Sequence, residues 1–245
     1  MGGIPVAGGR VVKRGLFFRG GALNAVTEAD KEKLRDLGIV CAIDLRTGWE
    51  REAKPDKEIP GIENLHIPFF DKEIVGIEYE KPISESIVDG HDFACDPSDF
   101  YRAMPNPLTA RQMRQALEVV FDHAMAGEAT LQHCSGGKDR TGVLALLTLT
   151  ILGADKDAIL QDYLETNIAR DANIQPIYER FLRLTGDEEV ARRVTDDHRA
   201  RPSNLENFYE ALDENFGNMN DFIHNHLGID NDRMQAIRAC CTEER

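Results

Sequence analysis

Short apolar segments alternate with helical patterns along residues 1–155, and this alternation limits the possible folds more than any other feature of the sequence. Residues 39–43 form a continuous apolar run, which is typical of a strand buried on both faces. The other strands that we predict are residues 16–18, 64–70 and 129–133. Helices are predicted at residues 27–37, 108–125 and about 141–152. Strands separated by helices imply βαβ units and a mainly parallel sheet.

Beyond residue 155 the pattern is helical only, and helices are predicted at residues 157–169, 174–185, 203–216, 219–226 and 232–240. Two predicted helices begin with a capping-box pattern, one at Thr27 with Asp30 and one at Ser203 with Glu206. No linker rich in glycine and serine divides the chain. We therefore predict one α/β domain, residues 1–245, with a central, mostly parallel sheet of four or five strands flanked by helices. Residues 16–155 would form its α/β core, and residues 156–245 an all-helical portion packed on that core.

The charge balance and the cysteine count restrict the partners and the compartment. The 245 residues carry a formal net charge of −14, which disfavours nucleic acid and anionic lipid, because Lys and Arg supply most of the affinity for phosphate backbones. The longest apolar stretch, residues 143–154, is too short to span a bilayer, and no secretory signal pattern is visible. Five cysteines do not suggest a disulfide framework, and we interpret Cys240 and Cys241 as surface thiols. We expect a cytoplasmic protein without membrane insertion and without a nucleic-acid partner.

A glycine-containing segment, His-Cys-Ser-Gly-Gly-Lys-Asp-Arg-Thr-Gly at residues 133–142, joins a predicted strand to a predicted helix. Its glycines allow successive backbone N–H groups to turn toward one point, which makes an anion-binding nest. The helix that follows aims its unpaired N–H groups and the positive end of its dipole at the same point. Arg140 adds a planar guanidinium that suits two phosphate oxygens. The segment therefore predicts a phosphate site with the sulfur of Cys134 at its floor.

The surroundings expected for Cys134 predict a nucleophile. A free thiol has a pKa of about 8.5, whereas thiols at helix N-termini beside cations fall to roughly 3.5–7.5. We expect a thiolate that attacks the phosphorus of a bound phosphomonoester and forms a cysteinyl-phosphate, which water then hydrolyses. Thr141 can donate its hydroxyl to the sulfur as it leaves. We expect neither a metal nor a cofactor, because backbone N–H groups and Arg140 supply the charge stabilisation.

The spacing of Cys134 and Arg140 and the following Thr resemble the phosphate-binding loop of the cysteine-based protein tyrosine phosphatase superfamily. The full segment is similar to the loop of a bacterial branch with Gly-Lys-Asp-Arg-Thr, which acts on phosphotyrosine, phosphoserine or phosphothreonine, and phosphoinositides. Residues 18–23, residues 43–47 with Glu50, and residues 162–167 resemble other segments of that branch. The resemblance implies Cys134 as nucleophile and Arg140 as phosphate-binding residue. It also implies that the remaining loop residues line the site: Ser135, Gly136, Gly137, Lys138, Asp139 and Thr141.

The proton donor for the leaving group has two candidates. The Trp-Pro-Asp lid of classical tyrosine phosphatases is missing from this chain. Asp71 stands where the resemblance to dual-specificity and lipid phosphatases places an acid, and Asp139 lies in the loop, where related bacterial enzymes have theirs. Asp44, Asp96 or no dedicated acid are the remaining options. For Asp44 we favour an ion pair with Arg46 or a helix cap.

The substrate and the role of Lys138 stay open at this point. Lys138 could bind a second phosphate of an inositol ring, or it could be solvated or paired with Asp71 or Asp139. We predict a metal-independent protein tyrosine or dual-specificity phosphatase acting on a phosphorylated protein, with a phosphoinositide phosphatase as the alternative. A phosphate-binding module without turnover would have no need of Cys134. An arsenate-reducing or sulfur-transfer enzyme is disfavoured because no second cysteine has a suitable spacing.

Overall fold

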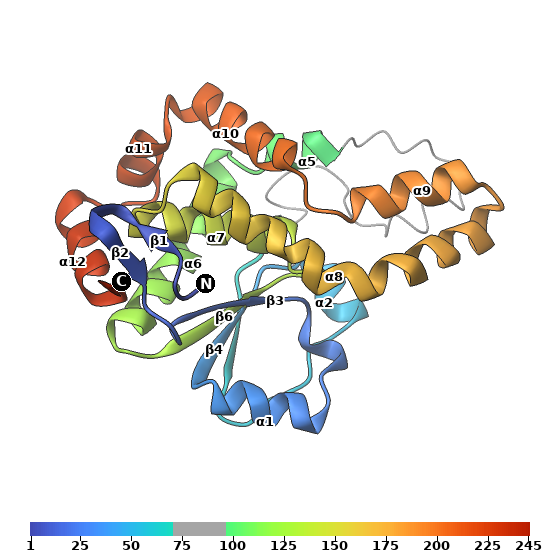
Figure 1. The fold of residues 1–245 in the computed structure, drawn as a ribbon, viewed down its shortest axis with the longest axis horizontal. Helices are drawn as coiled ribbons and strands as arrows, with labels where there is room; N and C mark the ends of the chain where they lie inside the picture. The colour runs from blue at the N-terminus through green and yellow to red at the C-terminus, as the bar shows by residue number, and fades with distance from the viewer. Residues whose placement is uncertain (71–96) are drawn as a thin grey trace.

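Four parallel strands form the centre of the fold (Figure 1), which confirms the predicted mostly parallel sheet. The computed structural model of the chain describes residues 1–70 and 97–245. The strand order is β3-β6-β4-β5, with β3 at Phe17–Gly20, β4 at Ile39–Asp44, β5 at Glu63–His66 and β6 at Ala129–His133. The strand predicted at residues 64–70 is thus shorter than expected.

The central strand β6 brings the carboxyl ends of its two neighbours together. Its last residue, His133, pairs in register with Gly20 of β3 and with Asp44 of β4. In a parallel sheet all carboxyl ends lie at one edge, and ligands of open α/β sheets bind there. The segment that follows His133 therefore starts at the edge where a site is expected.

Helices cover both faces of the sheet. Successive side chains of a strand point to opposite faces, and in β4 Cys41 and Ile43 belong to the main hydrophobic core whereas Ala42 belongs to a smaller one. The smaller core includes Leu34 of α1. Among the described residues before the carboxyl-terminal portion, the helices are α1 at Glu28–Asp36, α2 at Gly48–Ala53, α5 at Pro97–Ala103, α6 at Pro107–Met125 and α7 at Asp139–Leu152, with a short 3-10 turn, η2, at Leu23–Ala25.

Helix α7 is apolar around most of its circumference, which explains its central position. Eleven of its residues are buried, and it packs against α6, α8 and α12. Helix α6 is amphipathic instead, and Met113, Leu117 and Phe121 lie on its buried stripe. Both helices contribute to the main core, which also contains Phe208 and Ile237 from the carboxyl-terminal portion. The predicted packing of that portion on the sheet and its helices is therefore confirmed.

The carboxyl-terminal helices differ from the prediction in two places. They are α8 at Lys156–Thr185, α9 at Glu188–Asp197, α10 at Pro202–Phe216, α11 at Met219–Asp221, the π-helical turn η3 at Phe222–His226, and α12 at Asn231–Cys241. The two helices predicted at residues 157–169 and 174–185 are one helix, α8, because residues 170–173 contain no residue that breaks a helix. The second half, beyond Pro176, packs through Phe181 on α9. The capping box predicted at Ser203 is wrong: α10 begins at Pro202, which suits the first turn of a helix.

A second, antiparallel sheet joins the two ends of the chain, which lie close together in Figure 1. Its strands are β1 at Pro5–Val6, β2 at Arg10–Val12 and β7 at Thr242–Glu244, and the turn η1 at Ala7–Gly9 connects the first two. Arg10 Nε donates to Thr242 Oγ1 over 2.7 Å. The prediction of an all-helical carboxyl-terminal portion is thus wrong for β7, whose pairing is long-range. Cys240 is exposed as predicted, but Cys241 is buried.

Within residues 1–70 and 97–245, no helix combines the length and the apolar character that crossing a membrane requires.

Candidate active site

Residues 134–138 connect β6 to α7 at the carboxyl edge of the sheet. Cys134 directly follows β6 and its side chain is buried. Helix α7 begins at Asp139, and its N-cap residue, Lys138, makes no side-chain capping hydrogen bond. The first N–H groups of a helix lack intrahelical partners, so an uncapped start leaves them available to an anion. The structure thus places the predicted nucleophile next to a predicted anion-binding helix start.

Two loop glycines are required by close contacts. Gly137 has a φ of 67°, in the region that favours glycine, and a Cβ on it would lie 2.6 Å from the backbone oxygen of Gly20. A Cβ on Gly136 would lie 2.0 Å from Nη1 of Arg170. A side chain at position 137 would push the loop backbone away from β3, and one at position 136 would displace the guanidinium of Arg170.

Arg140 is held by a carboxylate from α2. Its Nη1 donates to Oε2 of Glu50 over 2.5 Å, and its Nη2 donates to Oε1 over 2.8 Å. Ser135 Oγ donates to the same Oε1 over 2.5 Å. Burial alone would raise the pKa of Glu50, but the hydrogen bonds and charge of Arg140 outweigh it and lower this pKa to about 2. Glu50 is therefore a carboxylate at neutral pH and fixes the guanidinium plane.

Two buried side-chain polar atoms in the first turn of α7 have no hydrogen-bond partner within the described part of the chain. They are Nε of Arg140 and Oγ1 of Thr141, and both are buried. Buried polar groups are nearly always hydrogen-bonded, so an unpartnered pair at the start of a helix marks a place for a ligand. An acceptor group such as a phosphate oxygen fits both.

Asp139 lies at the end of a chain of hydrogen bonds. Its Oδ1 accepts from the hydroxyl of Tyr101 over 2.6 Å, and this hydroxyl lies 2.6 Å from that of Tyr163. Asn204 donates to Tyr163 over 2.8 Å. Burial, followed by the charge of Asp139, raises the pKa of Tyr101, so its hydroxyl stays a donor. The chain connects α5, α8 and α10 to the first residue of α7.

Lys138 points away from solvent and is already bonded. Its Nζ donates to the backbone oxygens of Asp197 and, over 3.5 Å, Arg199, and it lies 3.3 Å from Oδ1 of Asp139. Of the roles considered from the sequence, the pairing with Asp139 is present. The loop is thereby tied to the segment between α9 and α10.

Comparison of the whole sequence with known protein families shows which family this chain belongs to. A family model described as "Tyrosine phosphatase family" matches residues 1–243. The chain belongs to this family. A curated protein of Cupriavidus necator named among the tyrosine-protein phosphatases is 28% identical over 233 residues, covering 94% of this chain and 81% of its own. The triple specificity protein phosphatase PtpB of Mycobacterium tuberculosis is 28% identical over 259 residues, covering 93% and 91%.

A solved structure shows a weaker likeness to the phosphatase. The crystal structure of TpbA from P. aeruginosa is 14% identical, covers 83% of this chain and 90% of its own, and superposes with a TM-score of 0.35.

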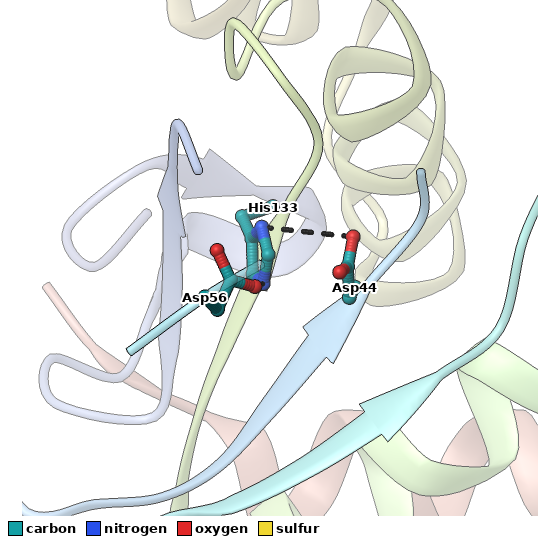
Figure 2. Close-up of side chains that lie close together, drawn as sticks. All are labelled: Asp44, Asp56 and His133. Atoms are coloured by element: carbon teal, nitrogen blue, oxygen red, sulfur yellow. Dashed lines mark ion pairs between the residues drawn. The ribbon is translucent and has the colours of Figure 1, made fainter. Parts of the chain in front are cut away.

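Behind the loop of the phosphatase, His133 lies between two carboxylates, Asp44 and Asp56 (Figure 2). His133 Nδ1 is 3.9 Å from Asp44 and its Nε2 is 3.3 Å from Asp56. A group of this kind could hold a metal ion, but Nη2 of Arg46 lies 2.7 Å from both carboxylates and supplies the positive charge. Burial lowers the pKa of His133, which favours the neutral ring. The ion pair predicted for Asp44 with Arg46 is confirmed.

Two of the candidate acids are not covered by the structure, and several contacts of the site could not be predicted from the sequence. Asp71 and Asp96 fall outside the residues that the structure describes. Glu50 was noted only as part of the resemblance, and its contact with Arg140 depends on how α2 packs against the loop. The network behind Asp139 had no sequence signal, because Tyr101 and Asn204 lie far from the loop in the chain.

Proposed function

We propose that the phosphatase hydrolyses phosphomonoesters through Cys134, without a metal. The thiolate sulfur attacks phosphorus, so that a sulfur–phosphorus bond forms while the bond from phosphorus to the ester oxygen breaks. The leaving oxygen takes a proton and departs as an alcohol or phenol. Water then attacks the cysteinyl-phosphate, releases inorganic phosphate and returns the sulfur, to which Thr141 can donate a hydrogen bond.

The observation that carries this proposal is the pair of buried, unpartnered donors in the first turn of α7, which follows the segment that begins with Cys134. Nε of Arg140 and Oγ1 of Thr141 lack partners among the described residues, and the start of α7 is uncapped. Glu50 uses the two terminal nitrogens of Arg140 and thereby leaves Nε for a ligand. Donors fixed in advance around developing charge stabilise a transition state without reorganisation, and this supports binding of the phosphoryl oxygens there.

The contacts of Asp139 support a role as an acceptor and weigh against it as the proton donor. Tyr101 donates to its Oδ1, and the ammonium of Lys138 lies beside the same oxygen. Both contacts engage the same oxygen of Asp139 in holding the start of α7, whereas a general acid must present its proton to the leaving group. We therefore assign the donor role to Asp71 and a positioning role at the start of α7 to Asp139.

For the substrate we propose phosphorylated proteins over phosphoinositides, with a cytoplasmic site of action and one domain over residues 1–245. Binding a second phosphate at Lys138 would require its Nζ to leave the backbone oxygens of Asp197 and Arg199. The formal net charge of −14 also disfavours docking to anionic membranes. Comparing kcat/KM for a phosphotyrosine peptide, a phosphoserine peptide and a phosphoinositide tests this choice, and a preference for the lipid would reverse it.

The test of the chemistry uses p-nitrophenyl phosphate with EDTA present. We expect turnover that vanadate inhibits, and loss of turnover with retained vanadate binding in Cys134→Ser. Absence of turnover over about pH 5 to pH 8 would contradict the enzyme assignment. An active Cys134→Ser variant would contradict the role of the sulfur.

A further inference from the structure

Three consecutive carbonyl groups of the loop are bonded on its outer side. The oxygen of Ser135 accepts from the backbone N–H of Ala22 over 3.3 Å. The oxygen of Gly136 accepts from Nη1 of Arg170 over 2.7 Å, and the oxygen of Gly137 accepts from Nη2 of Arg19 over 3.1 Å. Two of these three donors are thus guanidinium groups from elements other than the loop.

The direction of these carbonyls fixes the direction of the amides. In a trans peptide the C=O of one residue and the N–H of the next point opposite ways, and the described peptides are all trans. Holding the three oxygens outward therefore turns the N–H groups of Gly136, Gly137 and Lys138 to the other side of the loop. Successive N–H groups that face one way form an anion nest.

We propose that Arg19 and Arg170 are positioning residues that set this amide orientation for the phosphate. The inference rests on the proposed function, because it assigns the phosphoryl oxygens to the inner side of the loop. Neither residue needs to touch substrate. Each arginine holds one carbonyl oxygen of the loop. The N–H group of the same peptide then points to the inner side of the loop and binds the phosphoryl oxygen.

Helix α8 holds both guanidinium groups in place. Arg19 Nη1 donates to Oδ2 of Asp162 over 2.6 Å, and its Nη2 donates to Oγ1 of Thr166 over 2.6 Å. Asp162, Thr166 and Arg170 follow one another at intervals of four residues, so they share one face of α8. One face of this helix thus supplies Arg170 directly and fixes Arg19 through Asp162 and Thr166.

The close packing at Gly136 and Gly137 indicates that Arg170 and Arg19 act by direct contact with the loop rather than by the long-range effect of their charge. A Cβ on Gly136 would meet Nη1 of Arg170, so only a glycine allows this guanidinium to reach the carbonyl. The Gly137 carbonyl is reached from β3, whose residue Gly20 also contacts the loop backbone. A surface cation that acted only at long range would not require such contacts.

The test compares Arg170→Met and Arg170→Lys with the wild-type phosphatase. Lysine keeps the charge but is one atom shorter, so its ammonium falls short of the Gly136 oxygen. If the contact positions the amides, both variants lose about 10- to 100-fold in kcat/KM for p-nitrophenyl phosphate, with a parallel loss of vanadate affinity. Full activity in Arg170→Lys would show that charge alone suffices and would overturn the proposal.

Controls separate this outcome from misfolding and from failure of the enzyme assignment. Arg180→Met removes an exposed arginine of the same helix and should leave kinetics unchanged. Arg19→Ala would leave the buried Asp162 unpaired and could unfold the chain, so Arg19→Lys is used at that position.

In Cys134→Ser, the amide NMR signals of Gly137 and Lys138 should shift when inorganic phosphate is added. The shift should be smaller when the Arg170→Met substitution is also present. If the wild type shows neither turnover nor vanadate binding, the proposed function is contradicted. If the wild type is active and Arg170→Met has the same kcat/KM and vanadate affinity, only the positioning role of Arg170 is contradicted.

Discussion

Glu50 of α2 and Arg140 of α7 form a bidentate ion pair, with donor–acceptor distances of 2.5 and 2.8 Å. Two parallel bonds fix the plane of a guanidinium, whereas one bond leaves it free to rotate. The orientation of Nε in Arg140 therefore depends on a residue that stands far from the loop in the sequence.

Removing the charge of Glu50 should lower activity without removing the nucleophile. In Glu50→Gln one oxygen remains but the second acceptor becomes an amide donor, so Arg140 loses its fixed plane. We expect kcat/KM for p-nitrophenyl phosphate to fall by up to about 10²-fold, because small misplacements of catalytic groups cost that much. Glu52→Gln, an exposed residue on the same helix, is the matched control and should keep full activity.

The same pair should make stability depend on pH at the acid end. The folded pKa of Glu50, about 2, lies below its ordinary value of 4.5, so the carboxylate stabilises the fold above that value. This contribution, up to about 3 kcal/mol, is lost as the pH falls from 4.5 toward 2. In urea unfolding, the stability difference between wild type and Glu50→Gln should be largest near neutrality and shrink in this window. A constant difference would refute the assignment.

The leaving-group acid can be identified by comparing substrates. In Asp71→Asn we expect alkyl phosphates to lose about 10²- to 10⁴-fold in kcat/KM and p-nitrophenyl phosphate much less, because a good leaving group needs no proton. Asp139→Asn should affect both substrates alike. The reverse result, with the leaving-group dependence in Asp139→Asn, would transfer the acid role to the loop.

The hydroxyl of Tyr101 should matter through its bond to Asp139. Tyr101→Phe leaves the ring in place and removes two hydrogen bonds, one to Asp139 and one to Tyr163, which should lower the free energy of unfolding by about 1 to 3 kcal/mol. Activity should fall by the same factor on alkyl and aryl phosphates, since we assign Asp139 no proton transfer. Tyr209→Phe, at a ring that contacts Lys156, serves as the control.

Lys138 should hold the segment between α9 and α10 against the loop. In Lys138→Met the backbone oxygens of Asp197 and Arg199 lose their ammonium donor. We expect faster amide hydrogen exchange in residues 197–201, with no change at β4. If exchange stays the same and phosphoinositide turnover falls selectively, Lys138 binds a second phosphate instead.

The parts of the fold that the sequence predicted are those with a strong local pattern. The apolar run of β4, the strand β6, the glycine loop and the apolar α7 all lie where their patterns placed them, since burial on all sides leaves a continuous apolar signature. The capping box at Thr27 was correct for the same reason, because its two partners lie three residues apart.

The parts that were missed depend on contacts between distant segments. Strand β7 reads Thr-Glu-Glu and has no strand pattern, and it forms because β2 offers an unpaired edge. The continuity of α8 across residues 170–173, where the prediction divided it into two helices, includes Arg170, which contacts the distant Gly136. At the site, the loop residues could be named from the sequence, whereas the partners Glu50, Tyr101 and Arg170 required the tertiary structure.

Pro176 interrupts the backbone hydrogen bonding of α8 at one position. A proline inside a helix has no N–H for the carbonyl four residues earlier, here that of Ala172, and helices bend most easily at such points. Asp162, Thr166 and Arg170 all precede this position, while the outer half of α8 and its partner α9 follow it, projecting beyond the sheet in Figure 1. The missing hydrogen bond therefore weakens α8 only beyond the turns that hold Arg19 and Arg170 against the loop.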